Sequence, residues 1–597
     1  MWPLTGPFVP GFFIDSLNLI FIIMAALLWF AVSLYSYRYM KVEGRSRGFN
    51  IASLLTLVAV MGVFLARNLL TMLLFFELMT ISSYFWVIHR RDKEAIRAGY
   101  FYLFFSIIGG LFLVLGIVFM GAATDVLPAI GSGAVTPLNA RAFNWSMVFF
   151  LIGFGIKAGM VPLHLWLPHA HSTAPAPASG LLSGLLIKVG AYGLIRLGEF
   201  AGWGMGAGVN LKFLGVILLI TGILSMLLGV VAALLQSDAK RLLAYHSVSQ
   251  MGYIILGLGI SLYLGAEGVL GLLGAIYHVL NHALFKAALF LGVGIIYVYR
   301  KETDLYKLGG LWRQYPVTAI LMFFAVLGIT GAPGLNGYAS KTLLHHAVSF
   351  LSEKGGLWAG WLEWLFSLVG VGTTASFSKL YYLMFLAKPA EEDGIERLVN
   401  KKFVTERKLS GMQAAMVLLV ISMVLLGLFP QFFLYKMAVP AAETLGLSAE
   451  TALAGFSFWT FSDLAGIFIT LALGVLVCFA GLKSGAFHWQ PPQWLTLEGL
   501  GNLAFGELSL FWGEALEFYH FACRGIADTG MNLAGSLVRV LRRFEEPGSL
   551  TAGKSTFTGI SADLFLVFMV LAILLILFTL TRPELLDLSI LANLSGN

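Results

Sequence analysis

Residues 150–196, FLIGFGIKAGMVPLHLWLPHAHSTAPAPASGLLSGLLIKVGAYGLIR, decide the fold of this chain. The segment is apolar enough for a bilayer, yet it holds Lys157 and Lys188 far from any loop that could solvate them. An ammonium at membrane depth costs at least about 2.5 kcal/mol, so such a lysine faces a partner or a water-filled cavity. Four prolines between the lysines interrupt the helix, and broken helices at that depth need protein or water around their freed backbone groups. The segment therefore indicates an ion or proton pathway.

The composition predicts an all-α polytopic membrane protein. Of the 597 residues, 58% are hydrophobic and 12% are charged, whereas a soluble domain carries about 25% charged residues. The net charge of +7 lies mostly in short loops, which is typical of membrane topology and gives no indication of a nucleic-acid partner. Cys478 and Cys523 are isolated, so they form no ligand set for an iron–sulfur cluster. We therefore expect no cofactor in this chain.

Apolar runs of about 20 residues predict about 14 transmembrane helices. Residues 316–352 are counted as one helix that GITGAPGLNGYASK interrupts. With that count, the basic loops all follow odd-numbered helices, and the positive-inside rule then puts both termini outside. These loops contain Arg38, Lys41, Arg45 and Arg47; Arg90, Arg91, Lys93 and Arg97; Lys240 and Arg241; Arg300, Lys301, Lys307 and Arg313; and Lys388, Arg397, Lys401, Lys402, Arg407 and Lys408.

Broken segments at matching places in two halves favour two inverted five-helix repeats. We expect six parts: an N-terminal transmembrane helix in 1–47, a first repeat in 48–197, a second repeat in 212–387, two further transmembrane helices in 388–482, an amphipathic lateral helix in 494–545 and a C-terminal transmembrane helix in 560–581.

The lateral helix is predicted from a polar stripe that recurs at intervals of about four and seven residues. The stripe is Glu498, Asn502, Glu514, Arg524, Asp528, Asn532, Arg539 and Arg543. The loop count places it on the cytoplasmic side. Either it is a row of surface helices that holds the bundle, or it is a rod that reaches neighbouring subunits.

Glu77 lies in a span that has no other charge. A lone buried carboxylate would become protonated, so Glu77 either relays protons or pairs with a cation. Lys157 is the natural partner. A static structural ion pair is the alternative.

Five further residues extend the candidate pathway. Lys188 has no obvious anionic mate, and Lys341 follows the break at residues 333–337. His278, His282 and Lys286 stand at i, i+4 and i+8, which puts them on one helix face about 6 Å apart. We interpret these three as a proton relay. Metal binding by the two histidines is the alternative, although no third ligand is near.

Other histidines form a second set of candidates. His164, His169 and His171 are expected to face a loop or line a cavity, either as scaffolding of the helix break or in proton transfer. His246 lies in a polar run, YHSVSQ at residues 245–250, that either hydrates a half-channel or joins helices by hydrogen bonds.

At these residues the chain resembles the antiporter-like membrane subunits of respiratory complex I, of group 4 membrane-bound [NiFe] hydrogenases and formate hydrogenlyase, and of Mrp antiporters. The resemblance covers roughly residues 68–382. It is carried by FFELMTISSYF, by KAGMVPLHLWLPHAHSTAPAPASGLLSGLLIKVGAYGL, and by DAKRLLAYHSVSQMGY, HVLNHALFKAALF and PGLNGYASK. The family usually reads WLPDAH, and His169 here replaces the acid, which puts any role of that acid in doubt.

The resemblance implies a glutamate–lysine pair at Glu77 and Lys157, a bridging lysine at Lys188, and a central relay at His278, His282 and Lys286. Lys341 would be the terminal lysine of the second half-channel. It also implies a prokaryotic cell (inner) membrane, and lipids and other membrane subunits as neighbours. These subunits would include a further antiporter-like subunit and a quinone- or hydrogenase-module anchor. Peripheral redox subunits would carry iron–sulfur clusters with nickel-iron or flavin.

We therefore expect a proton-translocating subunit of an energy-converting redox complex, with no redox site of its own. The alternative is a subunit of an Mrp-type Na⁺/H⁺ antiporter without a redox partner.

Overall fold

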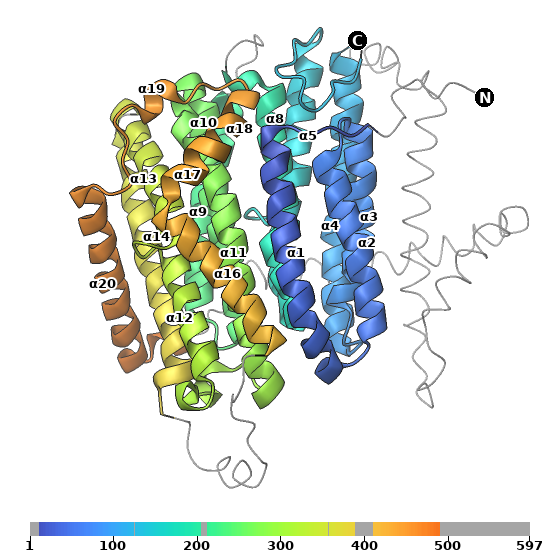
Figure 1. Cartoon of the computed structure of the whole chain (residues 1–597). Helices are drawn as coiled ribbons and strands as arrows, with labels where there is room; N and C mark the ends of the chain where they lie inside the picture. The colour runs from blue at the N-terminus through green and yellow to red at the C-terminus, as the bar shows by residue number, and fades with distance from the viewer. Residues whose placement is uncertain (1–10, 125, 205–211, 356, 389–409, 490–597) are drawn as a thin grey trace, which may run out of the picture. The chain divides into compact units, whose positions relative to one another are not determined.

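Long apolar helices make up the computed structural model (Figure 1), which describes residues 11–124, 126–204, 212–355, 357–388 and 410–489. The predicted lateral helix at 494–545 and the final span at 560–581 lie outside the described residues. Within these ranges the chain forms helices and three isolated β-bridges but no strand. Nine helical stretches there are long and apolar enough to cross a membrane, and one of them, residues 239–300, contains two successive helices. The all-helical membrane fold is therefore confirmed, while the number 14 and the inverted repeats stay predictions.

The first half of the described chain contains α1 (Ser16–Glu43), α2 (Ser46–Leu65), α3 (Leu69–Val87), α4 (Lys93–Ala123), α5 (Ala140–Ala158), α6 (Trp166–Thr173), α7 (Ala176–Leu181) and α8 (Ile187–Phe200). The rest contains α9 (Lys212–Leu234), α10 (Ala239–Leu264), α11 (Val269–Arg300), α12 (Pro316–Thr330), α13 (Asn336–Gly355), α14 (Leu357–Tyr381), α16 (Gly411–Leu428), α17 (Pro430–Phe433), α18 (Val439–Thr444), α19 (Glu450–Leu453) and α20 (Phe461–Ser484).

Short polar side chains fix where several helices begin. Each accepts a hydrogen bond from a backbone N–H of the first turn, and these N–H groups have no partner within the helix. The capping residues are Asp15 for α1, Asn68 for α3, Asp92 for α4, Asn139 for α5 and Asp238 for α10.

The helix breaks fall where the sequence predicts them. α5 ends at Gly159, whose φ of 70° is a left-handed conformation that glycine adopts without strain. A π-helical turn, Leu182–Leu186, joins α7 to α8. α12 ends before Gly331, with φ of 87°, and α13 begins at Asn336. At the break after α12, the carbonyls of Ile329 and Thr330 accept hydrogen bonds from the side chain of Lys341.

α11 is the central helix of the second half. It packs against α10, α12, α13 and α16, and it also contacts α1 and α7 of the first half (Figure 1). Every residue from Gly271 to Ile296 on this helix is buried. A titratable group on α11 therefore lies inside protein on every face.

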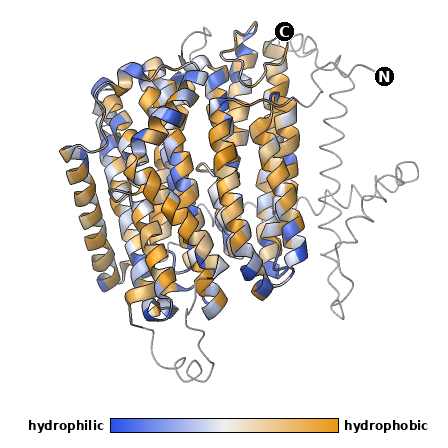
Figure 2. Ribbon diagram, viewed as in Figure 1, coloured by the Kyte–Doolittle hydropathy of each residue, from blue (hydrophilic) through white to orange (hydrophobic). Residues whose placement is uncertain are grey.

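The basic loops gather at one end of the helices, here called the basic end, which comprises residues 44–45, 88–92, 235–238 and 301–315. Arg45 Nη1 donates to the carbonyl of His89 at 3.1 Å. Lys301 Nζ lies 3.9 Å from Glu43 Oε2, and the backbone N–H of Ala239 donates to the carbonyl of Thr303 at 2.9 Å. Figure 2 shows hydrophilic residues at the helix ends and hydrophobic residues along their length. The connections after α1, α3, α9 and α11 thus meet at one end, as the positive-inside reading requires.

The opposite end is held by Arg196 of α8. This guanidinium is 1% exposed and binds Asp15 at 2.7 Å and Glu199 at 2.8 Å. Glu199 also accepts the backbone N–H of Gly133 at 3.0 Å. One buried cation therefore ties the start of α1 to the end of α8.

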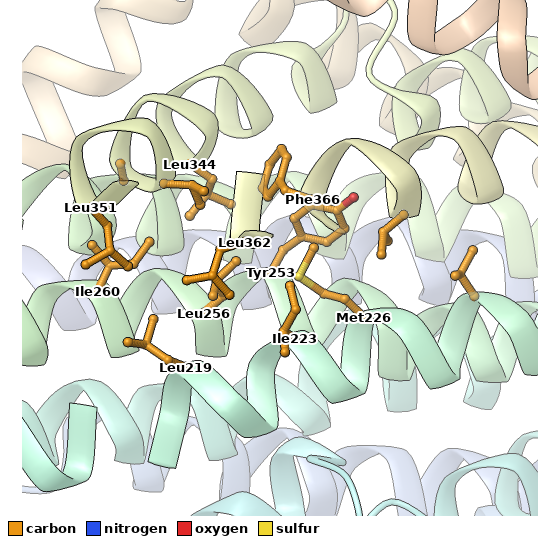
Figure 3. Packing of buried hydrophobic residues seen from close by; sticks show 14 residues of the cluster. Leu219, Ile223, Met226, Tyr253, Leu256, Ile260, Leu344, Leu351, Leu362 and Phe366 are labelled. Atoms are coloured by element: carbon orange, nitrogen blue, oxygen red, sulfur yellow. The ribbon is translucent and has the colours of Figure 1, made fainter. Parts of the chain in front are cut away.

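A hydrophobic cluster fills the space between α9, α10, α13 and α14 (Figure 3). Its labelled members are Leu219, Ile223, Met226, Tyr253, Leu256, Ile260, Leu344, Leu351, Leu362 and Phe366. Tyr253 also lies beside the candidate site, because the Lys341 Nζ is 5.4 Å from the centroid of its ring. The apolar cluster thus borders the polar interior of the second half on one side.

Candidate functional site

Glu77 on α3 and Lys157 on α5 are neighbours that do not form a contact ion pair in the described structure. Lys157 is 1% exposed, and its Nζ donates to Tyr102 Oη at 3.1 Å and to Thr80 Oγ1 at 3.3 Å. Glu77 Oε1 is buried and has no hydrogen-bond partner among the described residues. Thr80 is one helical turn beyond Glu77. Lys157 therefore binds hydroxyl oxygens near Glu77, one of them on the next turn of α3, instead of the carboxylate.

Aromatic rings surround the Lys157 ammonium. Its Nζ lies 5.4 Å from the ring centroid of Phe76, 5.1 Å from that of Tyr102 and 5.9 Å from that of Trp166. The faces of aromatic rings attract a cation. Lys157 is thus held in its present position by neutral groups, from which it can move without breaking a salt bridge.

Lys188 binds the π-helical turn that precedes α8. Its Nζ donates to the carbonyl of Ser183 at 2.5 Å. A π turn shifts the main-chain hydrogen-bond pattern by one residue, and such turns are frequent at functional sites. Lys188 therefore has a main-chain acceptor where the sequence offered no anionic mate.

Two serine hydroxyls lie between the carbonyl groups that bind Lys188 and Lys286. Ser183 Oγ lies 2.7 Å from Ser247 Oγ of α10, and Ser247 Oγ donates to the carbonyl of Leu243 at 3.1 Å. The same Leu243 carbonyl accepts a short hydrogen bond from Lys286 Nζ. The residues whose carbonyls hold the two lysines, Ser183 and Leu243, are thus linked through the hydroxyl of Ser247, which connects the π turn with α10 and α11.

The predicted face of α11 is confirmed. The ring centroids of His278 and His282 are 6.1 Å apart, and Lys286 follows one turn later. His278 Nδ1 lies 2.9 Å from Ser340 Oγ, and its Nε2 lies 3.1 Å from Gln250 Oε1. Both partners can accept a hydrogen bond, so the site can hold His278 with a proton on each nitrogen. Neither ring nitrogen of His282 has a hydrogen-bond partner within the described part of the chain.

Lys341 caps the broken end of α12. Its Nζ donates to the carbonyls of Ile329 at 2.8 Å and Thr330 at 3.3 Å. The carboxyl end of a helix carries a partial negative charge that favours a cation. Ser340, the residue before Lys341, binds His278. The end of the α11 relay and the lysine at the break are therefore adjacent.

The second set of histidines is also inside the protein. His164, His171 and His246 are buried, and His169 is half-buried. His171 stacks on Phe290 of α11 at 4.7 Å between ring centroids, and His246 lies 4.5 Å from the ring of Phe377 on α14. His169 stacks on Phe101 at 4.4 Å. These histidines therefore lie within the packed protein and not in exposed loops, and their role stays a prediction.

Two further buried lysines are not among the residues that the sequence singles out. Lys240, which the sequence places among the basic loop residues, is 6% exposed and donates to the carbonyl of Ala174 at 2.8 Å. Lys379 of α14 donates to the carbonyls of Leu234 at 2.6 Å and Gln236 at 2.8 Å. Lys379 could have been found, since it stands in an apolar run just as Lys157 does.

No group of three or more His, Cys, Asp or Glu side chains in the described ranges could hold a metal ion. The ligands on view are instead hydroxyls, carbonyls and imidazoles arranged around amines. The hydroxyls and imidazoles can pass protons, whereas the carbonyls can only accept hydrogen bonds from the amines.

These features define a multi-pass membrane protein with a row of ionisable side chains in its interior, a construction that marks ion and proton pathways. Residues 66–367 match the family described as NADH:quinone oxidoreductase/Mrp antiporter, transmembrane, and the chain belongs to this family.

Two curated relatives and one solved structure illustrate the similarity. Hydrogenase-4 component B of Escherichia coli is 34% identical over 57% of this chain and 51% of its own length. One of the Na(+)/H(+) antiporter subunits of Alkalihalophilus pseudofirmus is 30% identical over 57% of this chain and 67% of its own length. A chain of the Mrp complex from Dietzia sp. superposes with a TM-score of 0.63 at 22% identity, over 73% of this chain and 86% of that one, which supports the fold. The match thus spans about half the length of the hydrogenase relative.

Proposed function

We propose that this chain is a proton-translocating membrane subunit of an energy-converting redox complex, of the complex I or membrane-bound hydrogenase type. The observation that carries the proposal is that Lys188 and Lys286, each bound to a main-chain carbonyl, lie on either side of the Ser183–Ser247 hydroxyl pair. A hydroxyl pair between two buried amines can pass a proton when each amine turns from its carbonyl to the neighbouring hydroxyl.

The proposed mechanism is electrostatic. A change of charge at one end of the complex alters the attraction between Glu77 and Lys157. When Lys157 leaves the carboxylate and rests on Thr80 and Tyr102, its charge acts on Lys188 without a counter-charge. In a low-dielectric interior this repulsion is weakly screened. It drives a proton from Lys188 to Lys286, through His282 and His278, and on to Lys341.

The surroundings of the chain are part of the proposal. The basic end faces the cytoplasm of a prokaryotic cell, both termini lie outside, and residues 494–545 form the lateral helix on the cytoplasmic side. Other membrane subunits flank the chain, among them a second antiporter-like subunit and an anchor for the redox module. Peripheral partners hold iron–sulfur clusters with nickel-iron or flavin. Residues 48–197 and 212–387 are proposed as the two inverted repeats.

The test uses the intact complex in inside-out membrane vesicles, with hydrogen, formate or NADH as reductant. A pH-sensitive dye reports proton uptake while electron transfer is measured in the same sample. Lys157→Met should remove this chain's share of the proton yield per electron, because the amine that transmits the charge is lost, and leave the assembled complex intact. An unchanged yield per electron would refute the proposal.

A second candidate function is a subunit of an Mrp-type Na⁺/H⁺ antiporter. It is favoured by the antiporter relative from Alkalihalophilus pseudofirmus, two thirds of which the chain covers at 30% identity. In that case, NaCl added to vesicles without any reductant should move protons, and the purified complex should contain no nickel, iron–sulfur cluster or flavin. Proton movement that requires a reductant would reject this function.

A further inference from the structure

A small polar cavity lies at the basic end, between the ends of α1, α6 and α11 and the start of α10. It has a volume of about 40 Å³ and is lined by ten residues that include Glu43, Arg90, Ser172, Lys240, Tyr297 and Thr303. A cavity of this size has room for about three waters, and its polar walls offer the partners that each water needs. None of these residues belongs to the proposed row of proton carriers.

The side chain of Lys240 lines the inner side of the cavity. Its side chain is buried, and its Nζ donates to the carbonyl of Ala174 at 2.8 Å. Ala174 directly follows α6, whose last turn contains His171. Ser179 Oγ bridges the carbonyls of His171, at 3.3 Å, and Ala174, at 3.5 Å. The ammonium of Lys240 therefore lies about one helical turn from His171.

His171 lies between this cavity and the proposed proton row. It has no exposed surface, and neither of its ring nitrogens has a hydrogen-bond partner within the described residues. The ring stacks on Phe290 at 4.7 Å, and the centroid of the same Phe290 ring lies 5.3 Å from Lys286 Nζ. Phe290 thus touches both His171 and the amine of the central relay. An imidazole can take a proton on one nitrogen and release one from the other.

We propose that this cavity is the mouth through which protons enter from the basic side, with Lys240 and His171 carrying them inward to Lys286. The inference rests on the proposed function, since it supplies the row with its proton. Glu43, at the rim, accepts protons from water, and its carboxylate is 13% exposed and 3.9 Å from Lys301 Nζ. Lys240 then passes a proton through cavity water to His171.

The alternative is that Lys240 only anchors the carbonyl of Ala174. Substitution by arginine separates the two roles. Arginine keeps the positive charge and the N–H donors but does not release its proton in proteins. An anchoring role survives Lys240→Arg, whereas a proton-carrying role does not.

The first experiment tests on which side the cavity opens. In a chain carrying Cys478→Ala and Cys523→Ala, Thr303→Cys is exposed to a small charged methanethiosulfonate reagent. It should be modified in inside-out vesicles and not in right-side-out vesicles. Ser132→Cys is the matched control, because Ser132 is exposed near the opposite end of the bundle, and it should show the reverse. Modification of Thr303→Cys only from the outside would overturn the proposal.

The second experiment measures proton uptake of the assembled complex in inside-out vesicles, driven by reductant or NaCl. Lys240→Met, Lys240→Arg and His171→Gln should each slow uptake by about a hundredfold, the usual loss for a proton-transfer group. Lys307→Met should leave the rate unchanged, because Lys307 is 66% exposed, lies outside the cavity and pairs with Glu302 and Asp304 instead of Glu43. Normal uptake by Lys240→Arg would overturn the proposal.

Lys286→Met separates this inference from the proposed function. If Lys286→Met stops uptake while the Lys240 and His171 variants retain it, the entrance is wrong and the proposed function stands. If Lys286→Met takes up protons normally, the proposed function fails and the entrance fails with it. The amount of assembled complex, determined in each preparation, shows that a loss of uptake is not a loss of protein.

Discussion

Gly110 on α4 leaves the space that the carboxylate of Glu77 occupies. A Cβ built on Gly110 would lie 2.1 Å from Glu77 Oε1 and 3.0 Å from its Cδ, closer than non-bonded atoms can approach. The neighbouring Gly109 does not touch Glu77, and a Cβ there would meet the carbonyl oxygen of Gly153 at 3.4 Å. The position of the buried carboxylate thus depends on the absence of one methyl group on the adjacent helix.

Gly110→Ala should impair transport without removing any charge. The carboxylate is the flexible end of its side chain, so it can turn away at little cost in stability. A displacement of about 1 Å at a reacting group can cost about a hundredfold in rate, and we expect proton uptake to fall by that order. Gly109→Ala is the control and should transport normally. Equal uptake by both variants would show that the position of Glu77 is unimportant.

The serine connection between Lys188 and Lys286 predicts strong coupling of two substitutions. Ser183→Ala and Ser247→Ala each break the same Oγ–Oγ contact of 2.7 Å. If the hydroxyls act as one relay, either substitution should slow proton uptake by about tenfold or more, and the double variant should be no slower than the single ones. Uptake rates of the four proteins give the coupling energy. Additive losses would mean that the hydroxyls act independently.

Gln250 and Ser340 bind the two ring nitrogens of His278, and we expect their substitution to affect proton transfer differently. Gln250→Leu removes the acceptor at Nε2, which leaves a buried N–H unsatisfied at a cost of about 1–3 kcal/mol. Ser340→Ala also removes the contact between the relay and the residue next to Lys341. We expect both variants to slow uptake and only Ser340→Ala to uncouple Lys341, so that Lys341→Met adds no further loss in that background. A full further loss there would argue against the connection.

Asp15 and Arg196 predict an effect on stability and not on transport. Asp15→Asn removes one of two carboxylates from a guanidinium that is 1% exposed. A buried cation that loses part of its compensation is costly, and because Glu199 remains we expect a loss of about 1–3 kcal/mol. The melting temperature in detergent measures it. Glu267→Gln, at an ion pair whose partners are 57% and 43% exposed, should change stability by less than about 1 kcal/mol.

Much of the fold could be predicted from the sequence because its signals are local. The proline and glycines of GITGAPGLNGYASK mark a helix break in the sequence itself, and a histidine four residues after another shares its helix face. The predicted separation of His278 and His282, about 6 Å along one helix face, agrees with the 6.1 Å between their ring centroids. The basic loops meet at one end, as charge bias alone suggests.

The hydrogen-bond partners could not be predicted in the same way. Ser183 and Ser247 look like ordinary helical serines, and only the packing of α7 and α8 on α10 brings their hydroxyls together. Likewise, nothing local distinguishes Lys240 from Arg241, although one is buried against Ala174 and the other is half-buried at the surface. The separation of Lys157 from Glu77 depends on Thr80 and Tyr102, on two different helices.

Five buried lysines in the described part of the chain rest on main-chain carbonyls: Lys188, Lys240, Lys286, Lys341 and Lys379. A peptide oxygen has no proton to exchange and a fixed partial charge, so its hold on an amine depends only on distance and angle. A sub-ångström slide of one helix past another therefore changes how tightly each amine keeps its proton. In such an arrangement a mechanical displacement is converted directly into acidity, without any chemical change at the acceptor.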